Sequence, residues 1–315
     1  LLSLDADTLA DRRRLKRRLF LWRAGAIVAV LAALIVLVAE DGSLLPGAQI
    51  ARVSVTGIIV DDRAQQEMLE KIAKDDHVKA VILSIDSPGG TTTGAEALFA
   101  SVRQVAEEKP VVAVLGTVAA SGGYIAAISA DHIVARGNTI TGSIGVLFQW
   151  TQIEELLDSI GVEMKEVKSA PLKAEPNPFH KTSPEAIRAT QAMLDTSYAW
   201  FLRLVSERRG MDETRTRELG DGRVYTGWQA IENGLIDQVG GEEEALAWLE
   251  SEHGIQRDLP VKDWEPVYPE LGMAGFAGQA LGEAALTTIE GLSGKTLQTK
   301  RLTLDGLTSL WQPAL

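Results

Sequence analysis

Residues 111–127 read V-V-A-V-L-G-T-V-A-A-S-G-G-Y-I-A-A, and the rest of the chain is organised around them. Val111–Leu115 has the length and the β-branched content of a buried strand. Small residues then lead to Ser121, two glycines and the helix-like run Tyr124–Ala127. A strand, a tight turn and a helix start can expose a serine oxygen and offer free N–H groups to an oxyanion. The same pattern also fits ordinary packing, so it needs partners elsewhere in the chain.

Composition narrows the classes of function. A chain of 315 residues can form one large domain or two modest ones with a substantial core. The net charge of −12 argues against nucleic acid as a partner. The chain has no cysteine, which excludes thiol catalysis, thiolate metal sites and disulfides. Its four histidines stand far apart, without the spacing of a metal motif, so we expect neither a metal nor another cofactor.

The N-terminal region predicts a membrane anchor. A basic segment, residues 1–18, precedes the apolar residues 19–39, which only Arg23 interrupts. As a helix these residues would span about 31 Å, close to the thickness of the hydrocarbon core. A cleaved signal peptide is the alternative, but its apolar region is usually shorter. We therefore expect a single-pass helix in the inner membrane, with a cytoplasmic N-terminus and the residues that follow in the periplasm.

The remaining residues alternate between strand and helix patterns. A linker at residues 40–49 leads to a folded domain at 50–252 and a C-terminal extension at 253–315, in which no chemistry can be read. The alternation predicts an α/β fold whose largely parallel strands are buried on both faces. The expected strands are residues 50–60, 78–85, 111–115, 130–135 and 162–167, and the expected helices are residues 63–75, 92–108, 183–209 and 242–251.

Glycine-rich turns follow the strands. Asp86-Ser87-Pro88-Gly89-Gly90 comes directly after the second strand, and the Ser121 turn follows the third. Each alone fits an ordinary β-to-α turn, but parallel α/β sheets build their sites at this edge. Ser143 is a second serine between glycines, in Thr141-Gly142-Ser143-Ile144-Gly145. A proline-rich loop at residues 168–179 carries Lys168 and Lys173.

Together these stretches resemble the signal peptide peptidase A family of bacterial membrane serine peptidases, in its short, single-repeat form. The resemblance covers roughly residues 50–245 and the N-terminal anchor. The matching stretches, in chain order, are Asp86–Gly90, Ala119–Tyr124, Thr141–Val146, Leu172–Ala174 and Gly222–Gly227.

The resemblance implies the caseinolytic protease/crotonase-like fold and a Ser–Lys dyad. Ser121 falls on the family's nucleophile and Lys173 on its general base, Ser143 would hold the lysine amine, and Gly90 and Gly122 would supply the oxyanion N–H groups. A lysine acts as a base only when it is unprotonated, which requires a dehydrated site.

Two rival bases stay open. Lys168 competes with Lys173, although its neighbours Glu166 and Val167 suggest a strand end with a solvated charge. A histidine triad is the other rival, but no histidine lies in a glycine-rich turn, and Ser121 lacks the G-x-S-x-G elbow. His180 lies close to the lysine loop, where we expect a surface role.

As a function, the resemblance implies a membrane-anchored serine endopeptidase that degrades cleaved signal peptides and other short apolar segments. Cleavage of a membrane-protein partner is one alternative. A crotonase-like acyl-CoA enzyme and a catalytically inactive scaffold are two others. The family's double-length form joins serine and lysine from different domains. A single-repeat chain would therefore form a homo-oligomeric ring, with Ser121 from one subunit and Lys173 from its neighbour.

Overall fold

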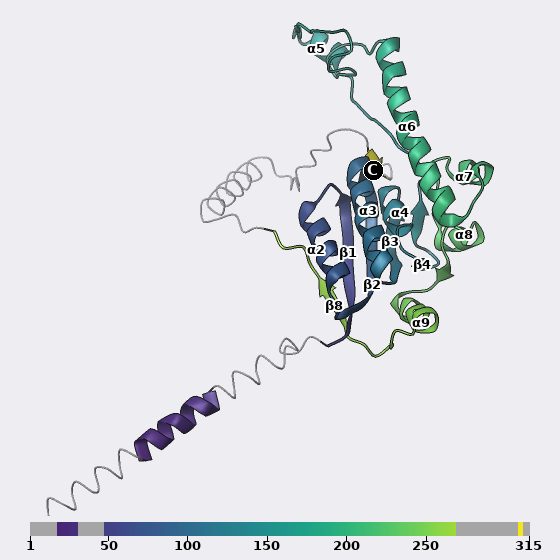
Figure 1. Cartoon of the computed structure of the whole chain (residues 1–315). Helices are drawn as coiled ribbons and strands as arrows, with labels where there is room; N and C mark the ends of the chain where they lie inside the picture. Colours follow the sequence, from purple (N-terminus) through teal and green to yellow (C-terminus); the bar gives the residue numbers. More distant parts are fainter. Residues whose placement is uncertain (1–17, 31–46, 269–307, 311–315) are drawn as a thin grey trace, which may run out of the picture. The chain divides into compact units, whose positions relative to one another are not determined.

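A computed structural model describes residues 18–30, 47–268 and 308–310 (Figure 1). The chain divides into two compact units, Leu1–Ala48 and Gln49–Leu315. In the first unit, residues 18–30 are helical. Across the described residues, no helix combines the length and the apolar character needed to cross a membrane. The expected anchor, residues 19–39, lies partly outside the described residues, since its part from 31 onward is not among them.

The second unit is built on a mostly parallel sheet, which confirms the expected α/β class. Its central strands pair parallel and in register, with Leu83 opposite both Val53 and Ala113. Ala113 in turn lies opposite Ile133. These strands are β1 (Gln49–Ile59), β2 (Val78–Thr91), β3 (Val111–Ala120) and β4 (His132–Ala135).

Shorter strands extend this sheet. The order is β6-β5-β3-β2-β1-β8, and β4 also pairs with β3 and with β7. The β5–β6 and β2–β9 pairs are antiparallel. The shorter strands are β5 (Ile140–Gly142), β6 (Val224–Thr226), β7 (Gln238–Val239), β8 (Val261–Trp264) and β9 (Thr308–Leu310).

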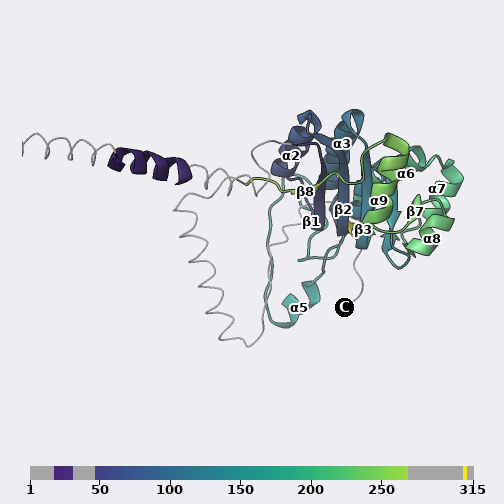
Figure 2. The same ribbon diagram turned by 90° about the horizontal axis from the view of Figure 1, so that it is seen from below.

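Helices cover both faces of the sheet, as the continuous apolar strands predict. Side chains of a strand alternate between the two faces. Ala51 and Val53 of β1 therefore belong to one apolar cluster, together with α2 (Arg63–Lys74) and α3 (Thr92–Glu108), which lie side by side (Figure 2). Ile50 belongs to a second cluster, on the other face, with Ala245 and Leu249 of α9 (Glu242–His253).

Helix α6 (Pro184–Arg209) begins and ends where the sequence predicts. The Ser183 side chain accepts a hydrogen bond from the N–H of Ala186, and Pro184 occupies the first turn, where its missing N–H costs nothing. Gly210, in the left-handed conformation at φ 61°, ends the helix. The shorter helices around it are α4 (Gly122–Ala127), α7 (Glu213–Leu219) and α8 (Gly227–Glu232).

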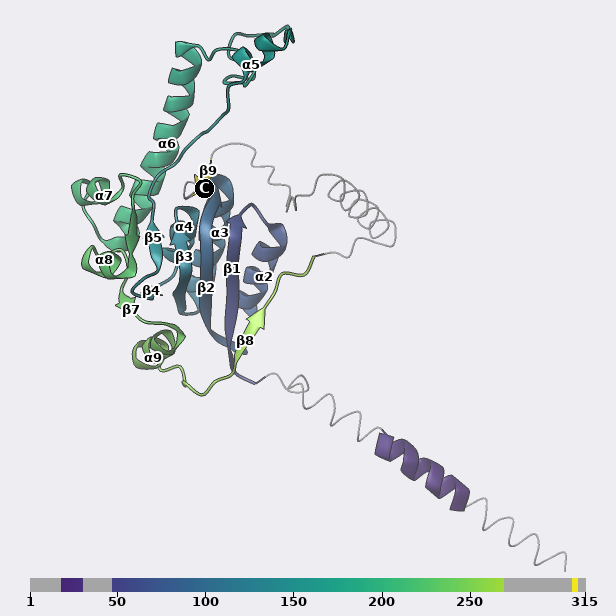
Figure 3. The same cartoon turned by 180° about the vertical axis from the view of Figure 1, so that it is seen from behind.

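Residues 147–183, here called the arm, lie beside the N-terminal end of α6 and beyond the sheet (Figures 1 and 3). The arm contains α5 (Glu154–Ser159). The strand expected at residues 162–167 is wrong, because this segment is irregular and Val167 is fully exposed. Its β-branched residues favour a strand only where a neighbouring strand or a core covers them, and the described part of the arm provides neither.

Candidate active site

Ser121 occupies the strand-to-helix turn that the sequence predicts. It follows β3 directly and is the N-cap of α4, with φ 55° and ψ −115°, a strained backbone conformation for a residue with a side chain. Its N–H donates to the carbonyl of Gly142 at 2.8 Å, and its own carbonyl accepts from the N–H of Ile125 at 3.0 Å. The residue is 1% exposed. These hydrogen bonds therefore fix the backbone of Ser121 at the turn.

Ser143 lies at the neighbouring strand end. Ala120, the last residue of β3, pairs with Gly142, the last residue of β5. The next residue on each strand is a serine, so the sheet register brings Ser121 and Ser143 together. Ser143 also has a positive φ, 51°, and its N–H donates to the carbonyl of Arg223 at 2.8 Å.

Gly90 lies in a strand rather than in the expected turn. The stretch from Asp86 to Gly90 continues β2, which ends at Thr91. The turn was expected because proline and two glycines usually interrupt a strand. Here Gly90 pairs with Ile59 of β1, and a Cβ atom on Gly90 would lie 1.8 Å from the Ile59 carbonyl oxygen. The backbones are packed too closely for any residue except glycine.

The end of β2 also packs against the start of α4. A Cβ atom on Gly123 would lie 2.6 Å from the carbonyl oxygen of Ser87. Gly122, the first residue of α4, is buried at this contact. Gly123 thus allows β2 and α4 to approach each other, and the structure places the segment from Ser87 to Gly90 beside the segment of Ser121 and Gly122.

The edge of β2 beside this site accepts an extended segment of the same chain. Strand β9 pairs antiparallel with Gly89–Thr91, with Ser309 opposite Gly90. Strand β1 already pairs with Gly89 and Gly90 on one side. Strand β9 therefore occupies the other side, which faces β3 and the Ser121 turn. Sequence reasoning did not predict this pairing.

Lys173 lies in the arm, beside the N-terminal end of α6. The C-terminal end of α6 reaches the end of α4, where Arg208 donates to the carbonyls of Ile128 and Ala130. The loop between α5 and α6, which carries Lys173, lies at the other end of the helix (Figures 1 and 3). Within one chain the structure brings together Ser121, Ser143, Gly90 and Gly122, but not Lys173.

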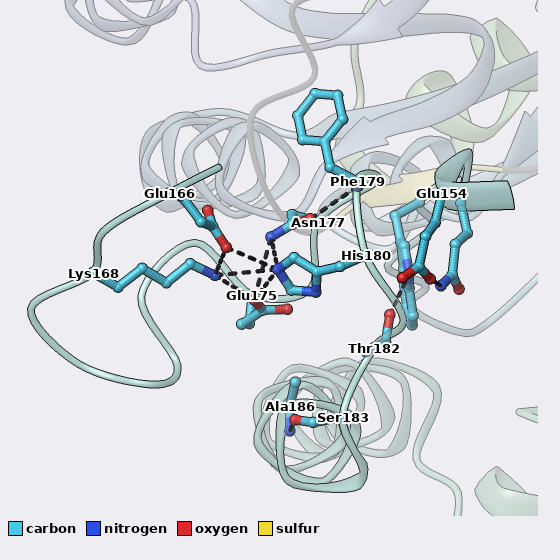
Figure 4. Close-up of polar contacts among 12 residues, drawn as sticks. Glu154, Glu166, Lys168, Glu175, Asn177, Phe179, His180, Thr182, Ser183 and Ala186 are labelled. Atoms are coloured by element: carbon cyan, nitrogen blue, oxygen red, sulfur yellow. Dashed lines mark hydrogen bonds and ion pairs between the residues drawn. The ribbon is translucent and has the colours of Figure 1, made fainter. Parts of the chain in front are cut away.

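Lys168, the rival base, is held in a cluster of polar side chains (Figure 4). Its Nζ atom lies 2.6 Å from Glu166 Oε1 and 2.5 Å from Glu175 Oε1. The hydrogen bond to Glu166 raises the pKa of Lys168 and lowers the pKa of Glu166. A lysine kept protonated in this way is poorly suited to remove a proton. Glu166, Lys168, Glu175, Asn177 and His180 are called the arm cluster below.

Sequence reasoning missed the arm cluster as a unit. His180 Nε2 lies 2.9 Å from Glu166 Oε1 and 2.7 Å from Asn177 Nδ2, and its side chain is half-buried rather than a free surface group. The charged residues on either side of the proline-rich loop were the available signal, but their pairing depends on how the loop folds back on itself.

Comparison with known proteins places these motifs in context. The sequence profile described as Peptidase family S49 matches residues 103–256. A putative protease of Synechocystis is 36% identical over 211 residues, which cover 67% of this chain and 76% of the relative. A protein of Enterococcus faecium named putative signal peptide peptidase SppA is 36% identical over 248 residues, covering 74% and 70%. Protease 4 of Haemophilus influenzae is 34% identical over 230 residues, covering 69% of this chain and 37% of that longer protein.

Proposed function

The chain belongs to the signal peptide peptidase A family, peptidase family S49, and on that premise we propose that it is a membrane-anchored serine endopeptidase with the caseinolytic protease/crotonase-like fold. Membership of this family supports a protease. In this proposal Ser121 is the nucleophile and Lys173 the general base. The substrates are cleaved signal peptides and other short apolar segments, in line with the name of the Enterococcus relative.

The conformation of Ser121 is the observation that carries the proposal. A buried serine with positive φ stands at the carboxyl edge of a parallel sheet, between Ser143 and the close-packed glycines of β2 and α4. Backbone strain of this kind gathers at functional sites, where the surrounding structure holds a residue in place. A turn that served packing alone would have no need of a hydroxyl in a strained conformation.

The proposed chemistry follows the usual steps of acyl transfer. Lys173, unprotonated, takes the proton of the Ser121 hydroxyl as Oγ attacks the peptide carbonyl carbon. The N–H groups of Gly90 and Gly122 stabilise the oxyanion that forms. The lysine then gives its proton to the leaving amine, and a water molecule hydrolyses the acyl-enzyme. Ser143 holds the lysine amine. The ion pairs of Lys168 with Glu166 and Glu175 keep that lysine protonated, which supports Lys173 as the base.

A peptide substrate would bind as an added strand. The edge formed by Gly89–Thr91 already pairs with β9 in the antiparallel sense. Strand addition uses main-chain hydrogen bonds, so it accepts peptides of varied sequence. Such binding suits an enzyme that degrades many different apolar segments, and it would lay the scissile bond beside the Ser121 turn.

The position of Lys173 supports a site shared between subunits. From Pro184 to Phe201, a fully buried residue of α6, the helix rises about 26 Å at 1.5 Å per residue. The lysine loop lies near Pro184 (Figure 3). Residues 144–146, which follow Ser143, instead line a pocket with Gln191 and Tyr198, further along the helix. Head-to-tail contacts in a closed ring would let each arm reach the serine of the next subunit.

The membrane anchor is part of the same proposal. Residues 19–39 would cross the inner membrane, with the basic residues 12–18 in the cytoplasm and the catalytic domain in the periplasm. We expect a reporter fused after residue 60 to be active only outside the cytoplasm. Activity of a cytoplasm-specific reporter at the same position would contradict both the topology and the location.

The nucleophile is tested with a fluorophosphonate probe and a fluorogenic peptide. We expect the probe to label Ser121, and Ser121→Ala to lose at least about a thousandfold in kcat, because the attacking group is removed. The fold should be unchanged, since the turn already consists of small residues. Retained turnover in Ser121→Ala, with Ser143→Ala inactive instead, would mean that Ser143 is the nucleophile.

The shared site is tested by complementation. Ser121→Ala and Lys173→Ala are each expected to be inactive. When the two variants are assembled together, some neighbouring pairs combine an intact serine with an intact lysine, and activity should return to a measurable fraction of wild type. Mixed oligomers that stay silent at every mixing ratio would place the dyad within one subunit.

A further inference from the structure

The arm cluster joins two legs of the arm across the loop that carries Lys173 (Figure 4). Glu166 and Lys168 come from the leg before the loop, and Glu175, Asn177 and His180 come from the leg after it. Glu175 Oε1 accepts from Lys168 Nζ at 2.5 Å and from Asn177 Nδ2 at 3.2 Å. The cluster therefore closes the loop at its base.

Lys173 lies on two overlapping turns inside this closed loop. Its N–H donates to the carbonyl of Ala170 at 3.1 Å, and the N–H of Glu175 donates to the carbonyl of Leu172 at 3.3 Å. Ala174, between Lys173 and Glu175, has a φ of 58°, which a residue with a Cβ atom adopts only when neighbouring contacts hold it. Glu175 is thus both the last residue of the turns and the anchor of the loop.

The Lys168–Glu175 pair is largely removed from water, unlike most of the arm. The exposed fractions of the two side chains are 17% and 6%. The second oxygen of Glu175, Oε2, is buried and has no hydrogen-bond partner among the described residues. The buried carboxylate therefore depends on its Oε1 contacts. Lys168 brings a permanent positive charge, whereas His180 Nε2, 3.0 Å away, brings one only when the histidine is protonated. Loss of the lysine would leave the buried carboxylate without a permanent compensating charge and force the loop to rearrange.

We propose that Lys168 and Glu175 are positioning residues for the general base. Their ion pair fixes the turns at residues 170–175, so that the arm presents Lys173 in one orientation. The inference rests on the proposed role of Lys173. In this inference Lys168 acts through its positive charge and through a side chain long enough to contact Glu175 across the loop. It does not contact the substrate.

A metal site is the alternative use of the same side chains. Glu166, Glu175 and His180 place one ligand atom each within 4.8 Å of one another. The ammonium group of Lys168, however, contacts Oε1 of both carboxylates, so it already supplies the positive charge between them. A cation would have to displace it. The charge balance favours the ion pair.

The test compares kinetic constants of full-length variants in detergent, measured on a fluorogenic peptide. We expect Lys168→Met to lower kcat at least tenfold with KM changed less than twofold, because the substrate edge on β2 is untouched. Lys168→Arg, which keeps the charge, should retain at least half of the wild-type kcat. Lys165→Met is the matched control, since Lys165 is in the same leg of the arm as Lys168, is 78% exposed and pairs with Glu163. The kcat of this variant should be unchanged.

The pH profile separates positioning from loss of structure. Lys173 is exposed in the single chain, so in the proposed shared site the neighbouring subunit would cover it. A misplaced base would stay in water, and the acid limb of kcat/KM in Lys168→Met should therefore move to higher pH. Loss of folded protein would lower the whole profile without moving that limb. If Lys168→Met does not fold, Glu175→Gln tests the inference in its place. We expect this variant to lose three- to tenfold in kcat and to show the same shift of the acid limb to higher pH.

Several outcomes would overturn the inference. Wild-type kcat in both Lys168→Met and Glu175→Gln would do so while leaving the proposed function intact, provided that Ser121→Ala and Lys173→Ala are inactive. Wild-type kcat in Lys173→Ala would overturn this inference together with the proposed dyad. Inactivation of the wild-type enzyme by EDTA, reversed by Zn²⁺, would assign the cluster to a metal instead.

Discussion

The two halves of the proposed site are built in opposite ways. The serine half is buried in the sheet, where Gly90 lies so close to β1 that a methyl group has no room. The lysine half lies in the arm, where an ion pair closes a largely exposed loop. Steric contact fixes the first half and electrostatic contact fixes the second. Shape should therefore control the serine half, whereas charge, pH and the neighbouring subunit should control the lysine half.

The largest effect is expected when one carbon atom is added to the serine half. In Gly90→Ala the new Cβ would meet the Ile59 carbonyl oxygen at 1.8 Å, so the backbone must shift. Displacement of reacting groups by about 1 Å costs on the order of a hundredfold. We expect kcat/KM to fall by about that factor, and urea denaturation to show a loss of stability of about 1 to 3 kcal/mol.

Gly145→Ala is the matched control for that change. Gly145 lies two residues beyond Ser143, and a Cβ atom there would be 3.7 Å from its nearest neighbour, the Cα atom of Gly222, which is an ordinary contact. Its kcat/KM should stay within about twofold of wild type. An equal loss of kcat/KM in Gly90→Ala and Gly145→Ala would contradict this explanation. The loss would then not come from the close packing of β2 on β1.

A smaller effect is expected when β9 is removed from the edge of β2. Strand β9 pairs with the segment on which we propose that peptides bind. A tethered competitor raises the concentration of peptide needed for binding. A chain ending at residue 300 should therefore show a KM about two- to tenfold lower, with little change in kcat. Ser309→Pro, which cannot donate to the pairing, should act in the same direction. Unchanged KM in both variants would show that β9 does not compete with substrate.

The pH dependence of the lysine half should be smaller still. The hydrogen bond to Glu166 is the chief cause that raises the pKa of His180. The protonated histidine therefore stabilises the arm cluster below its ordinary pKa of about 6.5, and this contribution is lost as the pH rises through the raised value. After correction for intrinsic rates, hydrogen exchange at residues 166–180 should increase about two- to threefold above that pH. His180→Gln should abolish the dependence, and a dependence that persists there would assign it to another group.

The smallest effect on activity is expected from Tyr124→Phe. The Tyr124 hydroxyl donates to the carbonyl of Leu235 at 2.8 Å, and burial raises the pKa of this phenol. Its loss leaves a buried carbonyl without that bond, which costs about 1 to 2 kcal/mol of unfolding free energy. The peptidase kcat should not change, because the hydroxyl bonds Leu235 rather than any proposed catalytic residue. Tyr268→Phe, at an exposed hydroxyl, should leave stability nearly unaltered.

The sequence was sufficient to predict the core because local signals and burial agree there. The apolar run from Val78 predicted β2, the pattern at residues 92–108 predicted α3, and Ser183 with Pro184 predicted the start of α6. The exceptions are places where tertiary contacts overrule local preference. Strand β2 passes through Pro88 and two glycines because β1 pairs with it there. Val162–Val167 has a strand pattern but lacks a partner in the described arm.

The placement of the motifs was predictable in part. Ser121, Ser143, Gly90 and Gly122 lie in glycine-rich motifs that follow strand patterns, and the sheet register brings their segments together. The catalytic roles given to these residues stay predictions. The arm cluster was not predictable, since Glu175 and Lys168 are bonded across a loop whose path no periodic pattern sets. The assignment of Lys173 as the base comes from the family resemblance and stays a prediction.

Helix α6 has a mechanical consequence for the enzyme. It is anchored in the core near Phe201 and Val205, and its other end bears the arm. Over about 26 Å of helix, a tilt of only about 5° at this anchored segment moves the N-terminal end of α6 by about 2 Å. The strands of the sheet would hardly move in response to such a tilt. A small repacking around Phe201 should therefore be amplified at Lys173, which in the proposed shared site lies beside the serine of another subunit.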